Sequence, residues 1–272
     1  EAGVNGQMIT LYDKGSHIPL MWTHLIPATL EGKAMHNVQN AMFAASIAFS
    51  LGVSLDSIRQ GLRTFDTSFF QAPGRMNVFS EHPFKVILDY GHNAHAVGVM
   101  TDLIQRLEVS NRRIVVLAAP GDRRDEDILE ITDVVTNKFD LYILKRDDGL
   151  RGRDADEIPN MMATRLKANG VPAENIHVIP DEQLAIDAAL NMAEAGDLLL
   201  IFGDALARCW KQITKFNPSG DMSHLGAVKK QVADSNAAMA SWINQNNDAS
   251  FSHMDGMTRD ERGIVYAPEQ DD

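Results

Sequence analysis

Cysteine is almost absent from the sequence, because Cys209 is the only one among 272 residues. A single cysteine can form neither an internal disulfide nor a thiolate metal site, which suits a reducing compartment. The sequence also lacks a signal-peptide pattern and any apolar run of the roughly 18 residues that cross a membrane as a helix. We therefore expect a cytoplasmic protein that has no membrane partner.

The sequence contains fewer basic than acidic residues. The 25 Lys and Arg residues face 37 Asp and Glu residues, which gives a formal net charge of -12. Such a surface disfavours non-specific binding to nucleic acid, so we expect no nucleic-acid partner, and any anionic ligand must be held by local groups. The content of 44% hydrophobic and 23% charged residues is typical of a globular chain, and the length predicts two units or one unit with appendages.

Two common nucleotide-binding loops are also missing. We find no G-x-x-x-x-G-K-[ST] phosphate loop and no G-x-G-x-x-G after a predicted strand. If the protein handles a nucleotide, part of that site lies elsewhere. The first residue is Glu1 and not Met, and residues 1–30 hold short apolar segments that are typical of strands but have no evident partners. We therefore expect a fragment or a processed product.

Two helices are predicted in the first part of the chain. The segment "HNVQNAMFAASIAFSLGV" indicates a helix over residues 36–51 that ends at Gly52, and Ser54 can cap a second helix, "LDSIRQGLRTF". The following segment, "DTSFFQAPGR", has the composition of a linker. Residues 1–72 are therefore predicted to form one unit.

Strands and helices alternate strictly after the linker. Crossover helices between short apolar strands require a parallel sheet that is covered on both faces. Residues 73–216 are thus predicted to form a doubly wound α/β domain with a mainly parallel sheet of about six strands, with "MNVF" as an antiparallel edge strand. The other strands are expected at "KVILDY", "RRIVVLAA", "DLYIL", "NIHVI" and "DLLLIFG", and the helices at residues 96–107, 125–137, 155–168, 181–195 and 205–216.

The end of the chain has a different composition. Residues 217–272 are rich in Asn, Ser, Met and Asp, and only "AVKKQVADSNAAMASWI" has helical spacing. We expect a docking helix there, followed by an acidic and partly disordered tail.

The loops expected at the carboxyl ends of the strands are unusually polar. They read "DYGHNAH", "APGDRRDED" and "KRDDGLRGRD", and ligands of open parallel sheets bind at this edge. Arg side chains there could bind the carboxylate of an amino acid, and Asp side chains its amine or a cationic side chain. The alternative is that these charges are merely solvated.

One strand end carries several polar groups. His92 and His95 have no third ligand in an obvious frame, so a structural or capping role is favoured over a metal site. Asp89 ends a buried strand, where an unpaired carboxylate would cost several kcal/mol, so it either reaches a ligand or caps the next helix.

Five segments in this order resemble the Mur ligase family, most closely the branch that makes cyanophycin. They are "GKAMHNVQNAMFAA", "PGRMNVF", "ILDYGHNA", "APGDRRDEDI" and "LRGRDADEI", and the likeness covers about residues 27–210. In that family a central ATPase domain carries the phosphate loop, and a C-terminal α/β domain closes over it with the incoming amino acid. The resemblance makes residues 1–72 the end of a central domain and residues 73–216 the C-terminal domain.

The resemblance also implies ATP and Mg²⁺ as cofactors. It places Asn37 and Asn40 near the adenine, and Arg75 and Asp89 near the ribose and phosphates, with closure of the two domains about the Gly74 region. We assign His92, in the turn after Asp89, to catalysis, and we assign no metal ligand. The family turn usually has a proline where this chain has Ala94.

The amino-acid loop of the family corresponds to "KRDDGLRGR". The residues that it implies as substrate-binding are Asp147, Asp148, Arg151 and Arg153, to which "GDRRD" adds Arg123 and Arg124. The implied partners are arginine and the cyanophycin polymer, and members of the family are usually homo-oligomers.

The implied reaction is amide formation: ATP converts an aspartate side chain of cyanophycin to an acyl phosphate, which the amine of arginine attacks. Free arginine and a β-aspartyl-arginine dipeptide fit equally well. The alternatives are another Mur-type ligase, acting on a peptidoglycan precursor or as a folylpolyglutamate synthase, and a non-catalytic module that binds a polymer or a partner protein.

Overall fold

The computed structural model describes residues 2–3, 6–217, 257–260 and 263–266, in two compact units, residues 1–232 and 233–272. In the second unit, β10 (Met257–Asp260) and β11 (Gly263–Tyr266) pair in antiparallel fashion. The helix expected over residues 227–243 and most of the acidic tail lie outside the described residues.

The first unit begins with an antiparallel sheet of β1 (Ala2–Gly3), β2 (Gly6–Asp13) and β3 (Ser16–Trp22). The apolar segments of β2 and β3 pair with each other, so the prediction that they lack partners is wrong. Lys14 and Gly15, between them, both have positive φ, as a tight two-residue hairpin turn requires.

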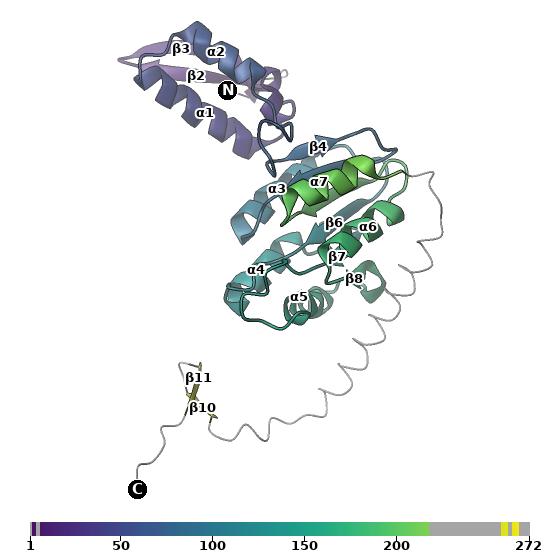
Figure 1. Ribbon diagram of the computed structural model, residues 1–272. Coiled ribbons are helices and arrows are strands. Elements are labelled where there is room, and N and C mark those ends of the chain that lie inside the picture. Colours follow the sequence, from purple (N-terminus) through teal and green to yellow (C-terminus); the bar gives the residue numbers. More distant parts are fainter. Residues whose placement is uncertain (1, 4–5, 218–256, 261–262, 267–272) are drawn as a thin grey trace. The chain divides into compact units, whose positions relative to one another are not determined.

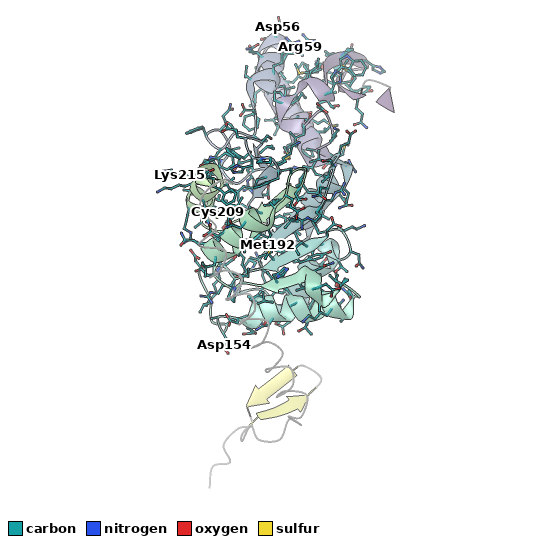
Figure 2. The ribbon with its side chains drawn as sticks, turned by 90° about the vertical axis from the view of Figure 1, so that its right-hand side faces the viewer. Asp56, Arg59, Asp154, Met192, Cys209 and Lys215 are labelled. Carbon is teal, nitrogen blue, oxygen red and sulfur yellow. The ribbon has the colours of Figure 1, made fainter. Side chains whose placement is uncertain are left out.

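Two helices cover this hairpin, α1 (Met35–Ser50) and α2 (Leu55–Thr64), and both agree with the predicted positions. The Ser54 hydroxyl caps α2 by accepting the N–H of Ser57. Arg59 lies beside Asp56 on α2 and donates to the carbonyls of Pro19 and Leu20 in β3 (Figure 2). Short 3-10 turns, Thr23–Leu25 and Pro27–Thr29, join the hairpin to α1.

The α/β domain holds a six-stranded sheet of order β4-β5-β9-β6-β7-β8. All neighbours are parallel except β4, which pairs with β5 in antiparallel fashion at the edge, as predicted for "MNVF". The strands are β4 (Asn77–Phe79), β5 (Lys85–Asp89), β6 (Arg113–Leu117), β7 (Leu141–Leu144), β8 (Ile176–Val178) and β9 (Leu198–Phe202).

Helices cover both faces of this sheet (Figure 1). On one face α3 (Ala94–Arg106), α4 (Asp125–Val135) and α5 (Glu157–Ala168) lie side by side. On the other, α6 (Glu182–Met192) and α7 (Leu206–Lys215) pack on alternate residues of the strands, among them Val86, Val116 and Ile201. The predicted doubly wound fold is confirmed.

The linker before β4 is bound to the α/β domain. The Asn77 side chain donates to the carbonyls of Thr67 and Ala72, at 2.8 Å each, and Phe69 stacks on Trp210 of α7 with ring centroids 5.0 Å apart. Gly74 donates its N–H to Asn77 Oδ1 at 2.7 Å, and its carbonyl accepts the N–H of Tyr90 at 2.9 Å.

Gly74 gives the first testable prediction. Its φ is +69°, and a methyl group at this position would overlap the Leu206 side chain, so Gly74→Ala is expected to lower the free energy of unfolding by about 2 kcal/mol or more. Gly98→Ala is the matched control, because Gly98 lies in α3 with open space around it and the change should stabilise by up to about 1 kcal/mol. Urea unfolding of the two variants and the wild type measures both changes in unfolding free energy. Equal changes would contradict the claim that the backbone at position 74 requires glycine.

Candidate functional site

A cleft opens at the carboxyl edge of the sheet, where the loops after β5, β6, β7 and β9 meet. Its volume is about 150 Å³, which is small beside the sites that hold drug-sized ligands. The side chains that could contact a charged ligand are Tyr90, His92, Arg123, Asp147, Arg151 and Asp204, and Ala118, Pro120 and Phe202 provide apolar wall.

The cleft contains charges of both signs. The Arg151 guanidinium donates to both carboxylate oxygens of Asp122 at 2.9 Å and so joins the loop after β7 to the loop after β6. Arg123 is exposed at the rim. Asp147 is half-buried, and within the described part of the chain its carboxylate forms no hydrogen bond. Burial raises the pKa of Asp147, the charges of Lys145 and Arg151 oppose that rise, and the charge of Asp204 adds to it. An unpaired acid therefore faces the cleft beside a second acid.

The turn after β5 supplies the remaining polar groups. His92 is half-buried, and its Nδ1 lies 3.1 Å from the carbonyl oxygen of Tyr90. Asn93 caps α3 by accepting the N–H of Ala96 at 2.9 Å, so the alternative that Asp89 caps this helix is wrong. His95 is exposed on α3.

Asp89 lies beneath the cleft and is 8% exposed. One carboxylate oxygen accepts the N–H of Met76 at 2.9 Å and the other accepts the N–H of Gly91 at 2.8 Å. Burial raises the pKa of Asp89, and these N–H groups and the charge of Arg75 oppose that rise. Asp89 therefore ties the turn that carries Arg75 to the turn that carries His92.

A second cavity, of about 560 Å³, lies along α1 and α2. It brings together Asn37, Asn40 and Arg75 on walls that are otherwise mostly apolar, whereas Asp89, which was expected beside Arg75, does not line it. The Asn37 side chain donates to Ala28 O at 2.7 Å and accepts from Asn40 at 3.2 Å, which fixes both amides.

Three predicted substrate residues do not line the cleft. Arg124 is paired with Asp127 one turn along α4, at 2.8 Å. Arg153 binds Asp125 and Glu157, each at 2.6 Å, and Asp148 binds Arg208 of α7 at 2.8 Å. Each of these charges has a partner of opposite charge: Arg153 and Asp148 bind residues of other elements and so help to hold the loops, whereas the Arg124 pair lies at the start of α4.

Sequence reasoning missed Asp204 and the buried ion pair behind it. Lys145 Nζ lies 2.9 Å from Glu182 Oε2, and neither side chain is exposed. Glu182 also accepts the N–H groups of Asp204 and Ala205, at 2.7 and 3.2 Å. These residues are far apart in the sequence, and the only signal was a charged residue directly after the apolar strand "LYIL".

The described residues hold no group of three or more His, Cys, Asp or Glu that could bind a metal ion. Among those same residues, the structure also contains no helix of sufficient length and apolarity to traverse a bilayer.

Glu182 gives the second prediction. Burial would raise its pKa, but Lys145, the Asp204 N–H and Arg208 outweigh burial and bring the pKa to about 2, against 4.5 ordinarily. Because the folded-state pKa is the lower one, the stabilisation is present above pH 4.5 and is lost as the pH falls towards 2.

Glu182→Gln has no carboxyl group to protonate at this position. From pH 5 to pH 3 the wild type should therefore lose about 2 kcal/mol more unfolding free energy than the variant does. Urea unfolding at both pH values measures this difference, and parallel pH dependences would contradict it.

Comparison with known proteins identifies the α/β domain. The family model described as "Mur ligase, glutamate ligase domain" matches residues 74–205. Cyanophycin synthetase from a Nostoc species is 35% identical over 91% of this chain, and that from a Synechocystis species is 34% identical over 72%. The chain spans only 27% and 22% of the length of these two relatives. A Fusobacterium nucleatum UDP-N-acetylmuramoyl-L-alanyl-D-glutamate--2,6-diaminopimelate ligase is 27% identical over 61% of the chain and 33% of the relative.

Solved structures agree in fold. Mycobacterium tuberculosis folylpolyglutamate synthase, complexed with ADP and AMPPCP, superposes with a TM-score of 0.56 at 18% identity over 80% of this chain and 47% of its own. A pseudomurein peptide ligase type C from Methanothermus fervidus gives a TM-score of 0.53 at 22% identity over 79% of this chain and 41% of its own. The chain belongs to the Mur ligase family, and its residues 74–205 form the C-terminal domain of that family.

Proposed function

We propose that this chain is part of an ATP-dependent ligase that adds arginine to the aspartate side chains of cyanophycin through an acyl phosphate. The observation that carries the proposal is the cleft at the carboxyl edge of the sheet, which presents Arg123 and Arg151 together with Asp147. A zwitterion with a cationic side chain is complementary to such a cleft. The similarity to cyanophycin synthetases, 34–35% identity over most of the chain, supports the same substrate class.

The chemistry explains why a nucleotide is needed. A carboxylate and an amine do not condense unaided in water, and ATP, when bound, supplies the phosphoryl group that activates the carboxylate. The task of this chain is then to bind and orient the incoming amine and to exclude water from the activated carboxylate. His92 stands at the cleft, where its imidazole can accept a proton from the attacking amine.

The second cavity fits the adenosine part of the nucleotide. Its apolar walls suit a base, and the fixed amides of Asn37 and Asn40 with the exposed guanidinium of Arg75 suit polar edges and phosphate. In this proposal Asp89, which is 8% exposed and lines neither the cavity nor the cleft, acts by holding the turn of Arg75.

Closure between the unit of residues 1–72 and the α/β domain was expected about the Gly74 region. In this proposal the hinge instead lies on the N-terminal side of Thr67. The linker from Thr67 to Asn77 is bound to the α/β domain by the Asn77 amide and by the Phe69–Trp210 stack, so Gly74 and Arg75 move with that domain. Magnesium is expected with ATP, and because the described residues offer no cluster of ligands for it, none of those residues is assigned to it.

A second candidate is another Mur-type ligase. Relatives named as 2,6-diaminopimelate and L-lysine ligases match 61% of the chain, and their named amino acids also carry an amino group on the side chain. Trials of arginine, lysine and 2,6-diaminopimelate as substrates separate the two. A non-catalytic binding module is disfavoured, because the cleft and the cavity retain Arg75, Arg123 and Asn37.

The third prediction concerns nucleotide use by the natural-length gene product. Arg75→Ala should reduce kcat/KM for ATP about tenfold or more, because one charge-assisted contact to phosphate is lost. Arg124→Ala is the control, since Arg124 is 76% exposed and bound to Asp127 outside the cavity. Arginine incorporation at varied ATP measures both variants. If Arg75→Ala and Asp89→Ala both incorporate arginine at the wild-type rate, the nucleotide assignment fails.

A further inference from the structure

We propose that Glu182 is a positioning residue, which holds Asp204 in the cleft so that Asp204 and Asp147 together receive the cationic side chain of the incoming amino acid. The inference rests on the proposed function and extends it to residues that lie outside the predicted substrate loop. Lys145 and Glu182 are the most buried charged residues in the described part of the chain.

Glu182 is the first residue of α6, and its side chain has no exposed surface. Its Oε2 accepts the N–H of Asp204 at 2.7 Å, and its Oε1 accepts that of Ala205 at 3.2 Å and the Arg208 guanidinium at 2.7 Å. Lys145, at the end of β7, contributes the fourth partner, at 2.9 Å. The Glu182 carboxylate thus fixes the β9–α7 loop through Asp204 and Ala205.

The same set of contacts connects this loop to the predicted substrate loop. Arg208, held by Glu182, also binds the Asp148 carboxylate at 2.8 Å. The N–H of Asp148 in turn donates to Asp204 Oδ2 at 3.0 Å. Asp204 is therefore fixed through its own N–H and through one carboxylate oxygen, and its side chain lines the cleft beside Asp147.

Stability alone accounts poorly for the Lys145–Glu182 pair. Buried ion pairs are often replaceable by apolar residues without loss of stability, because the desolvation of both charges offsets their attraction. Lys145 Nζ is an ion-pair partner at 2.9 Å but has no hydrogen bond of regular geometry among the described residues, so its burial is not offset by a full set of acceptors. A role in holding the β9–α7 loop explains why Glu182, with its four partners, is buried at this position.

Two neighbouring carboxylates favour a cation between them. Asp147 has no hydrogen bond within the described residues, and the nearby charge of Asp204 raises its pKa, although the charges of Lys145 and Arg151 oppose that rise. A guanidinium is planar and presents several N–H donors, so it can bind both acids at once. Arg123, on the loop after β6, is exposed and remains for the ligand's carboxylate, and Arg151, on the same loop as Asp147, lines the cleft while bound to Asp122.

The test uses the natural-length gene product and compares arginine with citrulline, its uncharged analogue. Asp204→Asn should raise KM for arginine roughly tenfold or more and narrow the preference for arginine over citrulline, with KM for ATP unchanged. The double variant Lys145→Met, Glu182→Met removes both buried charges and the two oxygens that accept the N–H groups of Asp204 and Ala205. It should therefore show the same rise in KM for arginine and the same narrower preference over citrulline. Glu182→Gln keeps one acceptor oxygen and should show them in part.

Asp197→Asn is the matched control. Asp197 is 2% exposed, accepts the N–H groups of Arg112 and Glu194 at 2.9 Å each and pairs with the Arg112 guanidinium, but it lies at the opposite edge of the sheet. Its loss should lower stability without changing the arginine-to-citrulline ratio. Hydrogen exchange provides a second readout: the Asp204 and Ala205 amides should lose protection in the Glu182 variants and keep it in Asp197→Asn.

The outcomes separate this inference from the proposed function. Wild-type KM and discrimination in folded Glu182 variants, with Asp204→Asn impaired, would overturn the positioning role and leave the ligase proposal intact. Wild-type behaviour of Asp204→Asn would overturn the two-acid subsite. If the double variant does not fold, Glu182→Gln decides by the same criteria. Failure of the wild type itself to incorporate arginine would instead refute the proposed function.

Discussion

The cleft depends on the return of β9 to the middle of the sheet. The chain builds β5, β6, β7 and β8 in order with α3, α4 and α5 on one face, then crosses back along the other face through α6 to insert β9 between β5 and β6. The loops after β5 and β9 consequently leave neighbouring strands towards opposite faces, and a crevice opens where they part. Every residue of β9 is buried, which explains its unbroken apolar sequence "LLLIF".

Two buried carboxylates then give this crevice a fixed shape. Asp89, at the end of β5, accepts one N–H from the turn before β4 and one from the turn after β5, and Glu182, at the start of α6, accepts those of the loop after β9. A buried carboxylate is tolerated only where donors surround it, so each acid enforces the position of the backbone that it binds. Asp147, which has no such donor within the described residues, faces the cleft together with Asp204, whose carboxylate accepts only the N–H of Asp148 among those residues.

Much of the fold followed from local pattern, and much of the site did not. The alternation of apolar strands and helices predicted the parallel sheet, and "MNVF" its edge strand, because both depend on neighbouring residues. The pairing of β2 with β3 was missed because the turn at Lys14 and Gly15 was not recognised. Arg124, Asp148 and Arg153 were expected in the cleft, but acids and bases on adjacent elements bind them instead. Lys145 and Glu182 meet only through the tertiary fold, so no local spacing marks them.

In the proposed mechanism the cleft between these loops receives the incoming amino acid, with its cationic end at the acids and its carboxylate at the arginines. A crystal structure of the natural-length protein with arginine and a non-hydrolysable ATP analogue measures this directly. The account predicts the guanidinium within hydrogen-bonding distance of Asp147 and Asp204, and the carboxylate directed at Arg123 or Arg151. Arginine bound elsewhere, with this cleft holding only solvent, would contradict it.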